Sequence, residues 1–192
     1  MDTNGSSLLV LQSSKKRGNG LIQQWDLMPV ELWLEILKCI YNSYKTTLDN
    51  VSLPPCFLDD VAALCSFNAK LKIHINNNIH FWKNLDNNKY MEFNMIENLM
   101  YYPIISDSLI QNLIQNLKLG YYFYVLLHQT AIHSNRIYIV KYLIETKGLP
   151  TSEFSLYEAS RTSIDMTKFI LLQKEFSSSI KQQVIHELKC ME

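Results

Sequence analysis

The sequence predicts an all-α protein made of two helical parts, and three observations lead to that prediction. Apolar residues recur at helical spacing in one segment after another. Gly and Pro number only five each, which is few for a fold built from many tight β-turns. Hydrophobic residues make up 47% of the 192 residues and charged residues 19%, a composition that supports a packed core.

The first 24 residues are rich in Ser, Gly, Asn and Lys and are predicted to form a flexible tail. The first helix is expected to begin near Met28, because Pro29 suits the first helical position and Glu31 suits the positive end of the helix dipole. One apolar stripe of this helix contains Leu32, Ile36, Leu37, Ile40 and Tyr41, whereas Trp33 and Leu34 lie off it. A helix that is apolar on more than one face is expected to serve both its own domain and a partner.

Three segments follow before residue 89. Residues 42–57 contain Asn, Ser, Thr and a Pro-Pro pair and are predicted to be a long loop. Helical spacing then predicts one helix over residues 58–75, which the Asn76-Asn77-Asn78 run ends. Residues 79–85 are predicted to form a third, short helix.

The remainder is predicted to be a series of short helices. Ser106-Asp107-Ser108 is a candidate N-terminal cap, and Gly120 and Gly148 suit helix C-termini. Tyr121 to Leu127 has strand propensity, but the neighbouring period of 3.6 favours helix. The expected helices are 91–101, 107–118, 121–133, 137–147, 153–162, 164–174 and 178–190.

Charge and apolar runs exclude several classes of protein. Eighteen basic residues balance 18 acidic ones, whereas a nucleic-acid-binding domain normally carries a basic excess, so we expect no nucleic-acid partner. The longest apolar run, Leu119 to Leu127, is far shorter than the roughly 18 residues of a membrane span. The apolar patch at Leu8 to Leu11 precedes its basic residues instead of following them, which argues against a signal peptide. We therefore expect a cytoplasmic protein without a membrane partner, with the nucleus as an alternative location.

No constellation of residues predicts catalysis, a metal or a cofactor. The five His lack the spacing of a helical zinc pair, and no Gly-rich phosphate loop or Gly-x-Ser-x-Gly elbow is present. Cys39 and Cys65 are expected to be small buried apolar residues, within a set of reduced thiols. Asp59 and Asp60 are best explained by a helix N-terminus. The sequence thus predicts a protein that is not an enzyme.

The segment from Met28 to Ile40, Met-Pro-Val-Glu-Leu-Trp-Leu-Glu-Ile-Leu-Lys-Cys-Ile, resembles the start of an F-box, whose pattern is Leu-Pro-x-Glu-Leu-x-x-x-Ile-Leu/Phe-x-x-Leu. Further on, Leu58-Asp59-Asp60-Val61 with Leu64 resembles the second F-box helix, and Phe67-Asn68-Ala69-Lys70-Leu71 stands where the family has Val-Ser/Cys-Lys-x-Trp. Phe81-Trp82-Lys83-Asn84-Leu85 resembles the closing Leu-Trp-x-x-Leu. The likeness covers residues 27–85 and departs from the family in the long 42–57 loop.

The resemblance implies an F-box domain over residues 25–88, a three-helix unit in which Leu32, Ile36, Leu64, Phe67 and Trp82 share one core. It also implies docking on a Skp-type adaptor, which joins a cullin scaffold. Trp33 has two open interpretations, as a core residue or as a partner contact. The residues implied to bind the adaptor are Met28, Pro29, Glu31, Leu32, Trp33, Ile36, Leu37 and Ile40.

Residues 89–192 faintly resemble ankyrin repeats. The line Ala131 to Glu145 follows the ankyrin pattern Ala-Ala-x-x-Gly-x-x-x-Val-Val-x-x-Leu-Leu, with Asn135 at the Gly position, where a left-handed turn is needed. A fainter copy, Leu156 to Leu172, lies about 27–28 residues further on, against about 33 in ankyrin repeats. Stacked helix pairs would place Ile139, Leu143, Phe169 and Leu172 in a shared core, and an unrelated helical bundle remains the alternative.

Together these likenesses imply a non-catalytic substrate receptor of a cullin ubiquitin ligase, which holds an unknown target protein with its C-terminal helices. The alternative is a helical-repeat interaction scaffold or decoy that engages no ligase. The small size and the Asn-, Ile-, Lys- and Tyr-rich composition also suit a viral or pathogen protein that acts in the cytoplasm of a host cell.

Overall fold

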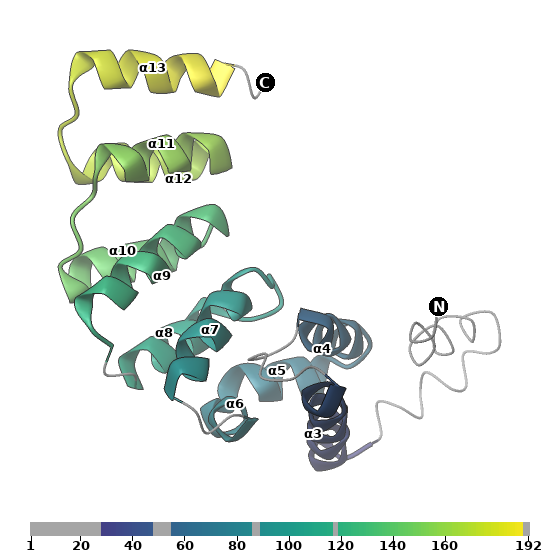
Figure 1. Ribbon diagram of the computed structural model, residues 1–192. Helices are drawn as coiled ribbons and strands as arrows, with labels where there is room; N and C mark the ends of the chain where they lie inside the picture. Colours follow the sequence, from purple (N-terminus) through teal and green to yellow (C-terminus); the bar gives the residue numbers. More distant parts are fainter. Residues whose placement is uncertain (1–27, 48–54, 86–88, 117–118, 190–192) are drawn as a thin grey trace. The chain divides into compact units, whose positions relative to one another are not determined.

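A computed structural model describes residues 28–47, 55–85, 89–116 and 119–189 (Figure 1). These residues contain eleven α-helices and no strand, which confirms the all-α class. The chain divides into two compact units, Met1–Asn87 and Asn88–Glu192, and each is described separately below. The predicted tail, residues 1–24, lies outside the described residues.

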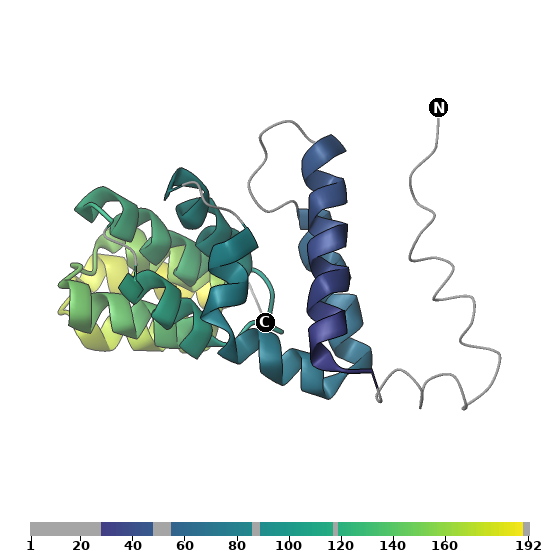
Figure 2. The same ribbon diagram turned by 90° about the horizontal axis from the view of Figure 1, so that it is seen from below.

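The described helices of the first unit are α3 (Val30–Thr47), α4 (Pro55–Phe67), α5 (Ala69–Asn77) and α6 (Ile79–Leu85). The long helix α3 packs against all three shorter helices, and α5 also packs against α4 and α6. Figure 2 shows α3 as a single straight helix in front of the shorter ones. The core therefore lies between one long helix and a layer of three short helices.

The core face of α3 differs from the predicted stripe. Trp33, Leu37 and Tyr41, spaced four residues apart, are 3%, 0% and 2% exposed, whereas Leu32 is 53% exposed and Ile36 is half-buried. The prediction that Leu32 lies in the core is wrong. The two large rings bury more apolar area than the Leu and Ile side chains, so this face turns inward.

The predicted 42–57 loop is also wrong, because helices occupy both of its ends. The Tyr41 and Phe57 rings pack edge to face with centroids 5.4 Å apart. The Tyr44 hydroxyl donates to Oδ2 of Asp60 at 2.9 Å. Since α4 begins at Pro55, Asp60 does not cap its N-terminus but lies within the helix as a buried acceptor. Desolvation raises the pKa of Asp60 and raises the pKa of Tyr44 to about 12.

The helix predicted over residues 58–75 is instead two helices that meet at Asn68. Its backbone is extended (φ −135°, ψ 99°), and its side-chain oxygen accepts from the Leu71 N–H at 2.9 Å as the cap of α5. Phe67, the last residue of α4, is 51% exposed, so its predicted place in the core is wrong.

Trp82 is fully buried, as predicted, and Leu64 is also in the core. The indole Nε1 of Trp82 donates to the Ile75 carbonyl at 2.8 Å, which ties α6 to the end of α5. The Phe81 ring meets the indole edge to face at a centroid distance of 5.2 Å. Trp82 thus stabilises the first unit through its burial and through one hydrogen bond.

The second unit is a stack of helix hairpins (Figure 1). In each hairpin the two helices are adjacent in the chain and pack together, and the first helices of successive hairpins also pack on one another, α7 on α9 and α9 on α11. The last described helix, α13, packs on α11. The strand alternative for Tyr121 to Leu127 is wrong, because this segment opens α9. The helices are α7 (Lys89–Met100), α8 (Asp107–Asn116), α9 (Tyr121–His133), α10 (Ile137–Lys147), α11 (Glu153–Thr162), α12 (Ile164–Gln173) and α13 (Ser178–Lys189).

The turns of this unit follow local chemistry. Asn135 adopts φ 56° between α9 and α10, which confirms the predicted left-handed turn. Gly148 ends α10 with φ 65°, also as predicted. Gly120 does not end α8, however; with φ −70° it caps the start of α9. Leu109 N–H donates to the Ser106 hydroxyl at 3.3 Å, which confirms the predicted cap cluster.

The shared core of the hairpins contains Ile139 and Leu143, both fully buried as predicted. Leu172 is 83% exposed, so its predicted core position is wrong, and Phe169 is half-buried. The buried apolar residues of α12 are Met166 and Ile170. Leu172 follows Ile170 by two residues, which is a rotation of about 200° around a helix and places it on the opposite side.

Arg136, next to the Asn135 turn, links its hairpin to the previous one. Its Nε donates to the Met100 carbonyl at 2.9 Å, and its Nη2 donates to the Tyr102 carbonyl. Nη1 donates to the Ile105 carbonyl at 2.8 Å and to Oδ1 of Asp107 at 2.9 Å. One guanidinium therefore satisfies the C-terminal end of α7, its connection to α8 and the first residue of α8.

The next hairpin is linked in the same direction. The Ser163 hydroxyl, in the turn between α11 and α12, donates to Oδ1 of Asn135 at 2.7 Å. His133 on α9 contacts the Glu158 carboxylate on α11. Three residues before His133 on α9, the Thr130 hydroxyl donates to Glu97 of α7 at 3.0 Å. Polar contacts thus join neighbouring hairpins beside the buried apolar core.

His128 on α9 makes folding of the second unit sensitive to acid. The side chain is 4% exposed, its Nε2 has no hydrogen-bond partner in the described part of the chain, and burial lowers its pKa to about 4. As the pH falls below 6.5, His128 becomes protonated in the unfolded chain, but in the folded protein it stays neutral down to about pH 4. The free energy of unfolding therefore decreases as the pH falls from 6.5 to 4. We expect a loss of about 2 kcal/mol in the free energy of unfolding between pH 8 and pH 5.

Urea unfolding followed by circular dichroism at both pH values measures this loss, with His128→Leu as the comparison. The variant keeps a side chain of similar size and removes the titrating group, so its stability is expected to change with pH by about 2 kcal/mol less than wild type. The other four His are common to both proteins. An identical pH dependence in the two proteins would contradict this role of His128.

Candidate partner-binding surface

Helix α3 carries a second apolar face beside its core face. Pro29, Leu32, Ile36 and Cys39 follow one another at spacings of three, four and three residues, so they line one side of the helix. Pro29, Leu32 and Cys39 are exposed and Ile36 is half-buried. We call these four residues the α3 stripe. It is the part of α3 that is apolar and accessible.

A polar face borders the stripe. Glu31, Glu35, Lys38 and Asn42 are exposed at helical spacing, and the Lys38 ammonium lies 2.6 Å from Oε1 of Glu35. Half-buried Ile40 lies between the stripe and the core face. The helix thus presents three separate faces: one packed, one charged and one apolar but open.

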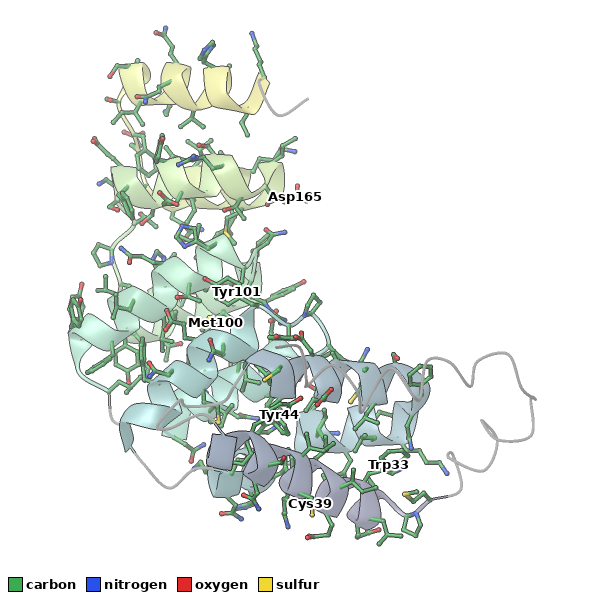
Figure 3. The ribbon with its side chains drawn as sticks, turned by 45° about the vertical axis from the view of Figure 1, so that its right-hand side comes forward. Trp33, Cys39, Tyr44, Met100, Tyr101 and Asp165 are labelled. Carbon is green, nitrogen blue, oxygen red and sulfur yellow. The ribbon has the colours of Figure 1, made fainter. Side chains whose placement is uncertain are left out.

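The structure divides the eight residues implied to bind an adaptor into two groups. Trp33 and Leu37 belong to the core of the first unit and hold α3 from inside. Figure 3 shows Trp33 on the side of α3 toward its neighbours and Cys39 on the outer side. The accessible or partly accessible residues are Met28, Pro29, Glu31, Leu32, Ile36 and Ile40.

Besides Leu32, three further accessible residues of the first unit are not expected from the sequence. Cys39 was predicted to be buried and is exposed. Phe67 and Ile73 are 51% and 62% exposed. The series Pro29, Leu32, Ile36 and Cys39 could have identified Cys39, because it continues the stripe by three residues. No comparable pattern in the sequence distinguishes Phe67 or Ile73 from core residues.

Buried Cys65 contrasts with Cys39. Desolvation raises the pKa of the Cys65 thiol to about 12, which keeps it protonated and unreactive near neutral pH. Cys39 lies in water on the α3 stripe. The first unit therefore offers an accessible thiol on the surface of interest and an inert one in its core.

The second unit exposes aromatic side chains at matching positions of successive hairpins. Tyr122 is the second residue of α9 and Phe154 is the second residue of α11, and they are 68% and 52% exposed. The helices α7, α9 and α11 begin at residues 89, 121 and 153, so each begins 32 residues after the one before. An exposed aromatic row at one end of the first helices is a second candidate contact surface.

Within the described residues, no group of three or more His, Cys, Asp and Glu side chains could hold a metal ion. None of the helices that the structure describes has both the length and the apolar character of a membrane crossing.

No protein-family model matches the chain, and the comparisons with curated proteins and with solved structures found no significant match.

Proposed function

We propose that the protein is an F-box substrate receptor, in which the α3 stripe docks on a Skp-type adaptor and the hairpin stack holds a target protein. The observation that carries the proposal is the accessible stripe on α3, a helix whose other apolar face is already used by the core. Exposed apolar patches commonly mark protein interfaces. The resemblance of residues 28–40 to the start of an F-box names the partner class.

The proposed mechanism is proximity. A receptor that binds the adaptor with one unit and a target with the other raises the effective concentration of target lysines near the ubiquitin-conjugating enzyme. No bond is made or broken by the receptor itself, so no catalytic residue, metal or cofactor is assigned to it.

The second unit suits the target-holding role. Stacked hairpins form extended surfaces that can be varied without loss of the core. The 32-residue spacing of α7, α9 and α11 is close to the roughly 33 residues of an ankyrin repeat. The exposed pair Tyr122 and Phe154 provides large rigid side chains of the kind that often dominate binding energy.

A charge on the stripe is the test of the proposal. Leu32→Asp is expected to weaken adaptor binding by about 10- to 100-fold, because interface energy is concentrated in few apolar anchors. Helix content should stay the same, since Leu32 is already 53% exposed. Affinity is measured by calorimetry with a purified Skp-type adaptor.

Ile185→Asp on α13 is the matched control, because Ile185 is 52% exposed in the other unit and should not affect the adaptor. If the well-folded wild-type protein does not bind the adaptor at tens of micromolar, the ligase receptor is excluded. The interaction scaffold then takes its place, since the aromatic row on the hairpin stack needs no ligase to bind a partner.

A further inference from the structure

The α3 stripe has a candidate occupant within the same chain. Leu8-Leu9-Val10-Leu11 are four consecutive apolar residues, flanked by Gly5-Ser6-Ser7 and by Gln12-Ser13-Ser14. Residues 1–27 lie outside the described part of the structure, and they lead directly into the helix that carries the stripe. An apolar segment in polar surroundings and an open apolar stripe therefore stand at the two ends of one short stretch of chain.

We propose that Leu8–Leu11 docks on the α3 stripe of its own chain and thereby competes with partners for that surface. The docking itself is independent of the identity of the partner. The competition with a Skp-type adaptor rests on the proposed function.

The length of the intervening chain permits this contact. Residues 12–27 join the apolar segment to Met28 and can span up to about 55 Å when extended. The stripe from Pro29 to Cys39 covers ten helical residues, or about 15 Å. The segment can therefore reach every residue of the stripe.

The tether also makes a weak contact sufficient. The sequence predicts a flexible connection over these residues, and a short connection of that kind gives an effective concentration in the millimolar range. The isolated segment then needs only a millimolar or better dissociation constant to occupy the stripe for most of the time. Burial of two or three apolar side chains against exposed Leu32 and half-buried Ile36 is enough contact for an affinity of that order.

Charge complementarity favours this segment over a second copy of α3. Lys15-Lys16-Arg17 follows Leu11 at a distance of four residues, and Glu31 and Glu35 are exposed on the polar face beside the stripe. The basic cluster can lie over these carboxylates while the apolar residues lie on the stripe. Such exposed pairs add little affinity, but they orient the segment. A second copy of α3 offers no comparable basic cluster, because its Lys38 is already paired with Glu35.

Cys39 is a built-in reporter of occupancy, because it is exposed on the stripe itself. The experiment uses the full chain with Cys56→Ser and Cys190→Ser, so that Cys39 and the buried Cys65 remain. The rate of maleimide labelling of Cys39 is measured in this protein and after Leu8, Leu9, Val10 and Leu11 are all changed to Ser. A control changes Gln23 and Gln24 to Ser and leaves the apolar segment intact.

We expect the four-Ser variant to label about fivefold faster, which corresponds to an effective concentration about four times the dissociation constant of the segment, and the Gln control to match the parent. The parent rate should not depend on protein concentration. Equal rates in the parent and the four-Ser variant would overturn the proposal. A parent rate that slows as the protein is concentrated would also overturn it, in favour of a contact between two copies.

Adaptor affinity separates this inference from the proposed function. If both hold, the four-Ser variant binds a Skp-type adaptor about fivefold more tightly than the parent, because the competing segment is gone. Absence of adaptor binding in both proteins defeats the ligase receptor and leaves the labelling result standing. Equal adaptor affinity together with equal labelling defeats the docking and leaves the receptor standing.

Discussion

Trp82→Ala is expected to lower the free energy of unfolding of the first unit by about 4 kcal/mol. The side chain is 0% exposed, so its removal leaves a cavity lined by the core. The substitution also removes the 2.8 Å hydrogen bond that the indole N–H of Trp82 donates to the Ile75 carbonyl. Helix α6 is short and is held to the end of α5 through this ring. A loss of that size is therefore expected to unfold the first unit at a moderate denaturant concentration.

Tryptophan fluorescence isolates this effect. The three Trp of the chain, Trp25, Trp33 and Trp82, all precede residue 88, so their emission reports on the first unit. In Trp82→Ala the remaining emission comes from Trp25 and Trp33, both in the first unit, while circular dichroism follows both units. Trp82→Phe is expected to cost less, because the phenyl ring fills most of the cavity and only the hydrogen bond is lost. A midpoint for Trp82→Ala equal to that of wild type would contradict the role assigned to the ring.

Arg136→Ala is expected to destabilise the second unit by about 4 kcal/mol. The guanidinium is 12% exposed and serves three carbonyls and the Asp107 carboxylate, which all lose a charged donor. Arg136→Lys is expected to recover only part of the loss, because one ammonium cannot reproduce the fork of the guanidinium. Circular dichroism measures the change, and the fluorescence transition of the first unit should not move.

Lys141→Ala is the matched control for Arg136. Its ammonium lies 3.8 Å from Glu145, and the two side chains are 54% and 61% exposed, so the pair is expected to contribute less than about 0.5 kcal/mol. Hydrogen exchange in Arg136→Ala should increase first at the end of α7 and at the start of α8. If Arg136→Ala were no more destabilising than Lys141→Ala, the link between hairpins would not depend on this side chain.

The helices of the second unit can be predicted from the sequence because capping and turn residues at their ends determine their boundaries. Ser106, Asn135 and Gly148 act through their own hydrogen bonds or backbone conformation, and the structure has all three where the sequence predicted them. The error at Gly120 has a local cause as well. Glycine is accepted both after a helix and before one, and only the neighbouring helix start decides between the two.

The core was harder to predict than the helices, because burial depends on neighbours that are distant in the sequence. On α3, Leu32 and Trp33 lie on different apolar faces, and periodicity alone does not say which face meets α4, α5 and α6. The same ambiguity misplaced Leu172. At Asn68 the helical pattern continued through a residue whose side chain prefers to cap a new helix.

The sequence predicts which helix carries the candidate surface, but not which of its side chains are accessible. The first helix was expected to bear the partner surface, and its accessible apolar residues include Leu32. The sequence allows Trp33 to be a core residue or a partner contact, and its 3% exposure assigns it to the core. Residue type alone predicts a buried Cys39, because a thiol behaves as a small apolar side chain, and only its spacing from Pro29, Leu32 and Ile36 indicates the exposed position.

The direction of the contacts between hairpins has a consequence for the order of events on the ribosome. Thr130, Arg136 and Ser163 all bond to residues that are synthesised earlier, so each emerging hairpin meets a partner surface that already exists. The Ile105 carbonyl in the connection between α7 and α8, however, receives the guanidinium donor only after Arg136 has left the exit tunnel. The first hairpin therefore reaches its full set of contacts only after the second hairpin has been synthesised.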